Sequence, residues 1–505
     1  MGQMDILDET IPELEKIAPP EIETGDLRKK TLSGMKWVFA SSFGQRAISF
    51  VTTVILARLL SPADFGLFAL AFVMIDGFGL FKSLGFDSAL LRRKTEVEEA
   101  ADTAFFLIPV FGFVLFILLF LLAPYGASFL SNPQVTPVVR ALSFIFVLSC
   151  LAQVPAILVQ KQLHFWKKAV PELASSVVYS VAAVVFAVLG FGVWSLVYAY
   201  LIKTFLYMVM IWRFAAWRPR FRFHAGIAKE MFHFGKFVFL GSLLVFLRNN
   251  LDNILIGKFL GVSALGFYAI AFNLATFLSH YVAGRMHAVL FPVFSRIQED
   301  TEMLKRAFLK SFKMISLMAI PFGLFLFAAA PTFLSVVYGE RWLPAGSVLR
   351  ILACAGILKA LIGPMGPVFL AQGRSRIDFW VSAVQTGVFF LLVVPAALFL
   401  GLSGVGGAVL VSAAASFAIA TARVRKAIRL SPREILLALK PTCIGSCLML
   451  FVFGSLARGR MLLAHVPAPV STAEFIVILG LSGLSYLFSV FFLDRDVRLE
   501  LRRFI

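Results

Sequence analysis

The sequence predicts an all-α polytopic membrane protein with about fourteen transmembrane helices. Three observations support this prediction: the composition, a series of long apolar stretches, and the alternating charge of the loops between them. Apolar residues make up 60% and charged residues 15% of the 505 positions, against roughly 45–50% and about 25% in an ordinary soluble protein. A soluble globule of this composition would lack the polar surface to cover itself, whereas a bilayer acts as an apolar solvent.

The apolar stretches have the length that a membrane requires. A hydrocarbon core about 30 Å thick is crossed by roughly 20 mostly apolar residues in a helix. Fourteen stretches satisfy this condition, at residues 35–57, 65–86, 103–123, 139–160, 169–189, 191–212, 234–257, 264–285, 312–334, 347–371, 378–400, 403–422, 436–456 and 473–493. In the tenth stretch, Gly363-Pro364 and Gly366-Pro367 mark the best candidate for a hinge, because proline removes a helix hydrogen bond.

Basic residues are concentrated in every second loop. Residues 92–94, 213–229 and 423–433 are rich in Arg and Lys, while the loops at 190–192 and 401–404 contain none. Cytoplasmic loops carry an excess of Lys and Arg, so the pattern predicts a multi-pass protein of a bacterial inner membrane with both termini in the cytoplasm. The Lys and Arg residues of the cytoplasmic loops then explain the net charge of +19. Because the charge has this explanation, no nucleic-acid partner is expected.

The first twelve stretches read as two sets of six. Residues 54–60 and 65–72 recur with similar sequence at 254–260 and 265–272, and Phe165-Trp166 and Gly192-Val193 are echoed at Phe379-Trp380 and Gly404-Val405. Each half has six spans, an even number, so both halves begin on the same side of the membrane and share one orientation. Two similar bundles that rock around a central site can provide alternating access. The predicted parts are an acidic mobile cytoplasmic tail at 1–30, six-helix bundles at 31–214 and 234–425, a basic cytoplasmic linker at 215–233, and two additional helices with a basic tail at 426–505.

Four segments carry a resemblance to a known family. They are Leu56–Gly66, Asp252–Gly257, Phe291–Gln298 and Arg341–Ala345. Together they resemble the polysaccharide-transport flippases of the multidrug/oligosaccharidyl-lipid/polysaccharide superfamily, over about 30–500, nearly the whole chain. The resemblance implies a V-shaped pair of bundles around a central cavity. It also implies transport of an oligosaccharide repeat unit on undecaprenyl pyrophosphate from the cytoplasmic to the periplasmic leaflet, for exopolysaccharide or lipopolysaccharide assembly. Whether the protein works alone or with a polymerase or export complex stays open.

Polar residues form stripes on the first and seventh stretches. Their spacing places them on one face of each helix: Ser42, Gln45, Arg46, Ser49, Thr52 and Thr53 on the first, and Ser242, Arg248, Asn249, Asp252 and Asn253 on the seventh. A shift of 200 residues aligns Ser49 with Asn249, Thr52 with Asp252 and Thr53 with Asn253. These matched faces predict a shared water-filled cavity, and polar packing between helices is the alternative.

The charges at membrane depth indicate an anionic substrate. Guanidinium groups suit a pyrophosphate because they form bidentate hydrogen bonds, and an ionisable group in the bilayer is costly unless it faces a cavity or a partner. The expected pyrophosphate site comprises Arg46 and Arg248, assisted by Lys359 or Arg285. The residues expected to contact the sugars are Ser49, Asn249, Asn253 and Gln385. The candidates for proton or cation coupling are Asp76, Asp252 and His280. The alternative is that Arg46 pairs with Asp76, and Arg248 with Asp252, so that each couple neutralises itself.

Two other functions are weighed against transport of a lipid-linked glycan. A cation-coupled multidrug exporter of the same superfamily would favour twelve spans and an acidic cavity. A membrane-embedded glycan polymerase would need a catalytic cluster in a substantial outer loop, and the longest outer stretches, 124–138, 335–346 and 457–472, lack one. No enzyme activity, cofactor or metal site is expected. The four cysteines lie in apolar stretches and are expected to be free buried thiols.

Overall fold

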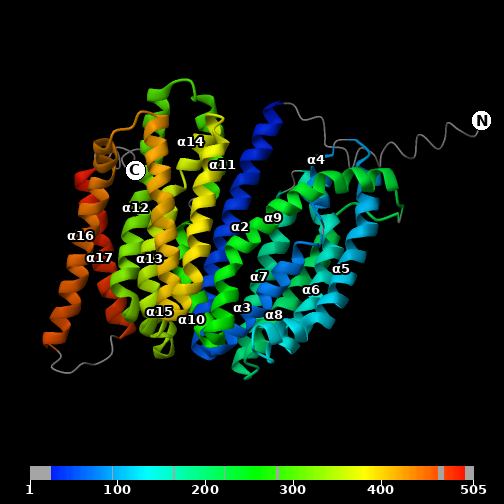
Figure 1. Cartoon of the computed structure of the whole chain (residues 1–505), viewed down its shortest axis with the longest axis horizontal. Coiled ribbons are helices and arrows are strands. Elements are labelled where there is room, and N and C mark those ends of the chain that lie inside the picture. Colours follow the sequence, from blue (N-terminus) through cyan, green and yellow to red (C-terminus); the bar gives the residue numbers. More distant parts are fainter. Residues whose placement is uncertain are drawn as a thin grey trace, which may run out of the picture. The chain divides into compact units, whose positions relative to one another are not determined.

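The computed structural model describes residues 24–82, 84–93, 95–162, 165–220, 222–279, 284–463 and 471–494, with the backbone but not every side chain of α2, α9, α11 and α16. Every regular element in these ranges is a helix (Figure 1). The all-α class predicted from the sequence is therefore confirmed. By backbone contacts the chain divides into two compact units, Met1–Lys258 and Phe259–Ile505.

Unit 1 contains eight of the described helices. They are α2 (Thr24–Leu59), α3 (Pro62–Gly79), α4 (Phe86–Arg92), α5 (Val97–Phe129), α6 (Val135–Lys161), α7 (Phe165–Val188), α8 (Val193–Phe214) and α9 (Ala225–Phe259). The start of α3 follows from its sequence: the Ser61 hydroxyl accepts a hydrogen bond from the Asp64 N–H, and the Asp64 carboxylate accepts one from the Ser61 N–H. Pro62 fits the first helical position because its missing N–H would have no partner there.

Unit 2 contains the remaining described helices. They are α10 (Gly261–Leu278), α11 (Gly284–Arg296), α12 (Thr301–Phe333), η2 (Leu334–Tyr338), η3 (Glu340–Trp342), α13 (Ala345–Ile362), α14 (Met365–Ala371), α15 (Ser375–Ala427), α16 (Pro432–Leu463) and α17 (Thr472–Leu493). The break between α13 and α14 falls at Gly363-Pro364, the predicted hinge. Buried side chains of α11 to α15 form a core that includes Phe294, Phe308, Phe312 and Phe369.

α15 is a hairpin of two helices. Gly401 interrupts it with φ 60° and ψ −142°, a conformation that an L side chain disfavours. Beyond this point the chain turns back, and the Ser416 hydroxyl reaches the carbonyl oxygen of Val381 at 3.5 Å. The hairpin matches the two predicted stretches 378–400 and 403–422 and the uncharged loop between them.

The fourteen predicted stretches each coincide with a helix, a pair of helices or one half of α15. Eleven helices in the described ranges are long and apolar enough to cross a membrane, and α15 counts once among them. α2 and α9, whose side chains are only partly described, are not among the eleven. The multi-pass membrane class is thus confirmed. The number fourteen, the V shape and the proposed bundle boundaries stay predictions.

The predicted cytoplasmic loops of unit 1 lie together at one end. Arg93, after α4, bonds to Glu96 at 2.5 Å and to Glu230 of α9 at 2.9 Å. The Lys161 ammonium, at the end of α6, donates hydrogen bonds to the carbonyl oxygens of Leu90 and Arg93. These contacts gather the loops at 92–97, 161–165 and 213–230, as the charge alternation requires.

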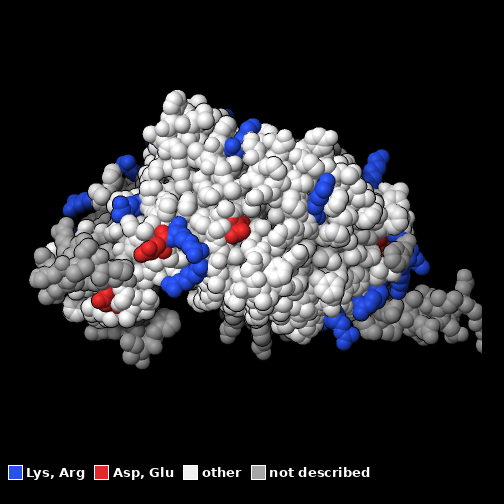
Figure 2. Space-filling model, turned by 90° about the horizontal axis from the view of Figure 1, so that it is seen from below, with Lys and Arg blue, Asp and Glu red and all other residues white. Residues whose placement is uncertain are grey.

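The corresponding loops of unit 2 also share an end. Lys305 lies 3.2 Å from Glu434 of α16, and the Gln372 amide donates to the Ala427 carbonyl at 3.4 Å. Lys313 of α12 donates to the buried Asp494 carboxylate, after α17, at 2.7 Å. In the view of Figure 2, uncharged residues (white) make up most of the surface and Lys and Arg (blue) are few.

α9 approaches α3 and α4 through glycines. A Cβ on Gly235 would overlap the Leu84 carbonyl, a Cβ on Gly257 would overlap the Leu70 side chain, and one on Gly77 of α3 would lie 3.0 Å from Phe246. The rings of Phe81 and Phe239 also pack at 5.0 Å. The seventh helix therefore packs against the first unit, although the sequence repeat groups it with the second.

The cysteine prediction is partly wrong. The four thiols are free, and Cys150 is buried as expected, but Cys443 and Cys447 are exposed. Both lie on α16, an apolar helix whose uncovered face suits lipid, so an apolar stretch did not imply burial inside the protein.

Candidate functional site

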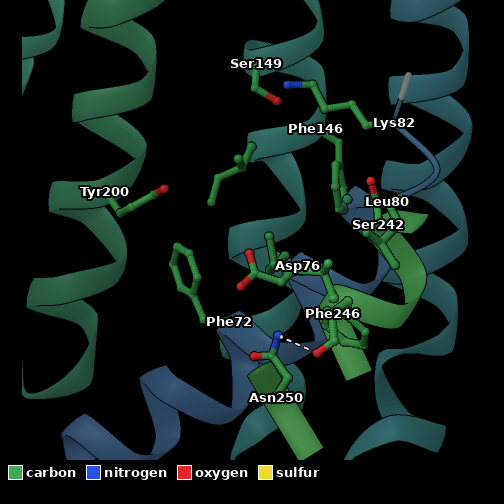
Figure 3. Close-up of a pocket in the computed structure, with 14 residues that line it drawn as sticks. Phe72, Asp76, Leu80, Lys82, Phe146, Ser149, Tyr200, Ser242, Phe246 and Asn250 are labelled. Atoms are coloured by element: carbon green, nitrogen blue, oxygen red, sulfur yellow. Dashed lines mark hydrogen bonds between the residues drawn. The ribbon is translucent and has the colours of Figure 1, made fainter. Parts of the chain in front are cut away.

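The largest of the described pockets in unit 1, the Asp76 pocket, has a volume of about 730 Å³. Its polar lining comes from four regions: Asp76 and Lys82 from α3 and the turn after it, Ser149 from α6, Tyr200 from α8, and Ser242 and Asn250 from α9. In Figure 3 the Asp76 carboxylate and the Tyr200 hydroxyl point into the pocket, and Lys82 extends toward Ser149.

Aromatic rings form the walls between these polar groups. Phe72, Phe146 and Phe246 line the Asp76 pocket together with Tyr200. The rings of Phe72 and Tyr200 meet edge to face at 4.8 Å. The Asn250 amide donates to the Phe246 carbonyl at 3.3 Å (Figure 3), which orients it at the pocket rim. A ligand here would meet flat apolar surfaces and hydrogen-bonding groups of both kinds.

A second, smaller cavity, the Lys203 pocket, lies between α2, α7 and α8. Its volume is about 250 Å³, and most of its lining is polar. The residues are Gln45, Arg46 and Ser49 of α2, Ser176, Tyr179 and Ser180 of α7, and Lys203 of α8, with Ile48 as the apolar member. Two cations thus line one small cavity beside several hydroxyl groups.

Lys203 is held by aromatic rings. Its ammonium group lies 5.6 Å from the Tyr179 ring centroid and 5.5 Å from the Tyr200 ring centroid, within the range of a cation–π interaction. Glu172 and Arg46 are its charged neighbours. Tyr200 also lines the Asp76 pocket, whose charged residues are Asp76 and Lys82, so its ring contacts a lysine of one pocket and lines the other.

A third cavity, the Gln153 pocket, adjoins the Asp76 pocket. It has a volume of about 330 Å³, and Lys82 and Ser149 line both cavities. The Gln153 amide donates to one Asp87 oxygen at 2.7 Å, while the other Asp87 oxygen and the Gln153 oxygen are buried without a hydrogen-bond partner in the described structure. Buried acceptors of this kind call for water or a donor from a ligand. Sequence reasoning missed this cavity because its residues lie on five segments.

Three predicted site residues of unit 1 line these cavities. Arg46 and Ser49 line the Lys203 pocket, and Asp76 lines the pocket named after it. Arg46 and Asp76 therefore face different cavities. Among the predicted residues of α9, Asn249 is exposed and Asn253 is half-buried. Asp252 is buried, and its carboxylate accepts the Asn253 N–H at 2.9 Å.

The repeat-related residues of α2 and α9 have matching exposure. Thr52 and Asp252 are both buried, Ser49 and Asn249 are both exposed, and Thr53 and Asn253 are both half-buried. These three pairs of equivalent positions thus have similar exposure. The two stripes nevertheless reach different cavities. Ser242 of the α9 stripe lines the Asp76 pocket, as does Asn250 outside the stripe, whereas the α2 stripe lines the Lys203 pocket.

The other predicted residues lie in unit 2 or outside the described residues. The Lys359 ammonium lies 5.0 Å from the Phe272 ring centroid, and Gln385 is half-buried in α15. The side chains of Arg248 and Arg285, and all of His280, lie outside the described residues, as do the tails at 1–23 and 495–505. The roles assigned to all these site residues stay predictions. No cluster of metal-binding side chains occurs in the part of the chain that the structure describes.

Three curated relatives are bacterial biosynthesis proteins. The teichuronic acid biosynthesis protein TuaB of Bacillus subtilis is 29% identical over 71% of this chain and 75% of its own length. The lipopolysaccharide biosynthesis protein WzxC of Escherichia coli is 27% identical over 75% and 77%. The succinoglycan biosynthesis transport protein ExoT of Rhizobium meliloti is 27% identical over 72% and 74%.

Solved structures share the fold. The lipid II flippase MurJ in an inward closed conformation aligns with a TM-score of 0.73 over 92% of this chain and 99% of its own, at 12% identity. An inward-facing MATE multidrug transporter aligns with a TM-score of 0.59 over 77% and 96%, at 18% identity. The family model described as "Polysaccharide biosynthesis protein" matches residues 55–347. The match spans more than half of the sequence, so the chain belongs to the polysaccharide biosynthesis protein family.

Proposed function

We propose that this membrane transport protein of polysaccharide biosynthesis flips undecaprenyl-pyrophosphate-linked oligosaccharide repeat units from the cytoplasmic to the periplasmic leaflet by alternating access. The family and the names of its relatives support a transport step in polysaccharide biosynthesis. The lipid carrier, the inner-membrane location and the cytoplasmic termini belong to the proposal.

The observation that carries the proposal is the Lys203 pocket. Arg46 and Lys203 line it at a depth where a charge is costly unless a cavity or a partner receives it. A pyrophosphate carries delocalised negative charge, which a guanidinium binds with paired hydrogen bonds and an ammonium binds as a point charge. Ser49 adds a hydroxyl group that can donate to a phosphate oxygen, whereas the Ser176 and Ser180 hydroxyls already donate to the carbonyl oxygens of Glu172 and Ser176. The pocket therefore suits the charged group of the carrier.

The Asp76 pocket suits the sugars. Its rings offer flat apolar surfaces, which match the C–H faces of a sugar ring. Asp76, Asn250 and Ser242 offer the acceptors and donors that sugar hydroxyls require. Its volume of about 730 Å³ falls in the usual range for ligand sites. Asp76 is exposed toward the pocket and is a candidate for proton coupling, together with Asp252 and His280.

A multidrug exporter is the second candidate, and one observation favours it. An acidic side chain among four aromatic rings, as in the Asp76 pocket, can also receive an amphipathic cation. Lys82 in the same pocket and the two cations of the Lys203 pocket oppose a cationic ligand. The likeness to the MATE transporter concerns the fold alone. Transport of the anionic glycolipid therefore remains the better proposal.

The decisive experiment is deletion of the gene in its host, followed by analysis of undecaprenyl-linked glycans on each side of the membrane. Complete repeat units should accumulate on the cytoplasmic side and disappear when the wild-type gene is restored. Accumulation of unpolymerised units on the periplasmic side would instead indicate a polymerase. Unchanged glycans with increased sensitivity to cationic drugs would indicate the multidrug exporter.

A further inference from the structure

A groove lies between the two halves of the α15 hairpin, away from the proposed transport pockets. Its volume is about 650 Å³. Arg376 at the start of the hairpin and Arg423 and Lys426 at its end line it together with Trp380, Val384 and Ile419. These three cations belong to the loops that we predict to be cytoplasmic. The groove thus combines a basic end, at the level expected for lipid headgroups, with an apolar wall that extends along the helices.

The three cations have no acidic partner among the residues that the structure describes. None of them forms an ion pair or a hydrogen bond with another residue that the structure describes, and no Asp or Glu lines the groove. Three like charges around one cavity repel each other unless an anion lies between them. The groove is therefore complementary to a negatively charged group.

The groove opens on the outer side of the hairpin. The opposite side of both halves packs into the core of unit 2 through Val381, Ala420 and Val424, which are at most 5% exposed. Beside the groove, Phe379 is 63% and Trp380 is 54% exposed. Exposed aromatic residues at the end of a membrane helix are typical of the interface between lipid and water.

The sequence of the first repeat differs from that of the second at the position of this groove. The echo of Phe165-Trp166 at Phe379-Trp380 pairs Trp166 with Trp380. Gly192-Val193 of the first repeat corresponds to Gly404-Val405 of the second, so the last helices of the two repeats are offset by 212 residues. With this offset, Phe214 corresponds to Lys426. In unit 1, the rings of Trp166 and Phe214 pack edge to face at 5.5 Å. In unit 2 a cation replaces the second ring, so the cavity carries charge, and Trp380 is 54% exposed against 43% for Trp166.

We infer that this groove binds an anionic phospholipid of the surrounding bilayer, with its phosphate between Arg376, Arg423 and Lys426 and an acyl chain along Trp380, Val384 and Ile419. Basic pockets between membrane helices on the cytoplasmic side are suited to anionic lipid headgroups. Arginine provides paired hydrogen bonds to a phosphate, and lysine adds a third charge. The bound lipid would join the two halves of the hairpin at the end opposite Gly401.

The test uses the purified full-length protein and native mass spectrometry with added lipids. Wild-type protein should bind phosphatidylglycerol in preference to phosphatidylethanolamine. The variant R376Q/R423Q/K426Q should bind phosphatidylglycerol at least about tenfold more weakly, because each nearby cation contributes to the attraction of an anionic lipid. The matched control R374Q/R425Q/R433Q removes the same charge from exposed residues that do not line the groove and should bind like wild type.

Three results would overturn the inference: no preference of the wild type for the anionic lipid, equal binding by the groove variant, or an equal loss in the control. If undecaprenyl phosphate displaced phosphatidylglycerol and the groove variant lost both, the groove would belong to the carrier and the phospholipid assignment would be wrong. A second measurement, fluorescence quenching by a brominated lipid, tests the groove without changing its charge. Brominated phosphatidylglycerol in vesicles should quench wild-type fluorescence more than that of W380F, and equal quenching would reject the groove.

Discussion

At the scale of single residues, the Lys203 pocket is the place where the proposed transport can be tested most directly. Replacing Arg46 or Lys203 with Ala should weaken glycolipid export about 10-fold or more, because each change removes a charge-assisted hydrogen bond of roughly 1.5–3 kcal/mol to the pyrophosphate. The measurement is complementation of the deletion strain, normalised to the amount of protein in the membrane.

Arg58 provides the matched control. It is an exposed arginine on the same helix, α2, and does not line the Lys203 pocket. Arg58→Ala should export normally. Wild-type export by Arg46→Ala, Lys203→Ala and the double variant would eliminate the pocket as the pyrophosphate site, while leaving the transport function itself open.

Asp76 allows a separate test of coupling. If protons drive transport through this carboxylate, Asp76→Asn, which cannot bind or release a proton, should abolish the response of transport to an imposed pH gradient in proteoliposomes. Asp76→Glu keeps an ionisable group and should retain part of the response. An Asn variant that still responds fully would assign coupling to another residue.

Some of these residues were predictable and others were not. Arg46, Ser49 and Asp76 are polar residues in otherwise apolar stretches, and this contrast identified them. Tyr179 and Tyr200 gave no such signal, because a tyrosine in an apolar helix usually packs in a core. Their position beside Lys203 depends on how α7 and α8 pack, which no local pattern encodes.

At the scale of helices, the contact between α9 and the α3–α4 turn should be sensitive to one added methyl group. Gly235→Ala would place a Cβ against the backbone of Leu84, which cannot move like the end of a side chain. We expect a loss of about 1–3 kcal/mol of stability, the usual cost of overpacking. Thermal unfolding of the purified protein measures it.

The control lies on the same helix. Gly226 has open space at its Cβ position, so Gly226→Ala should be neutral or slightly stabilising, because alanine is the better helix former. If Gly235→Ala unfolded at the same temperature as Gly226→Ala, the close approach of α9 to Leu84 would be wrong.

Helix positions were predicted well from the sequence because length and hydropathy determine them. The turn at Gly401 and the break at Gly363-Pro364 were also predictable, since both use residues with special backbone properties. The side on which α9 packs could not be predicted from the sequence. The repeat relates α9 to α2 by sequence, but the glycines that bring it against α3 and α4 are meaningful only once their partners are known.

At the scale of the whole molecule, the alternation of charge predicts which loops lie on each side of the membrane. Alkaline phosphatase is active only in the periplasm and green fluorescent protein only in the cytoplasm. A phosphatase fused after residue 190 should be active, and one fused after residue 219 should be inactive; the fluorescent protein should give the opposite pattern. The same activity at both sites would show that a span had been miscounted between them.

The glycine contacts of α9 have a consequence for motion. Helices that interlock through large side chains must unpack them before one can shift, whereas a backbone that rests on a backbone presents few protrusions to lift. Only Gly235 makes such a contact, against the backbone of Leu84 and Gly85, whereas the Leu70 side chain meets Gly257 and the Phe246 ring meets Gly77. The part of α9 around Gly235 can therefore shift with few side chains to unpack, while the part that carries Phe246 and Gly257 is interlocked with α3. Ser242 lies between these two parts, so a bend between them would move it in the Asp76 pocket.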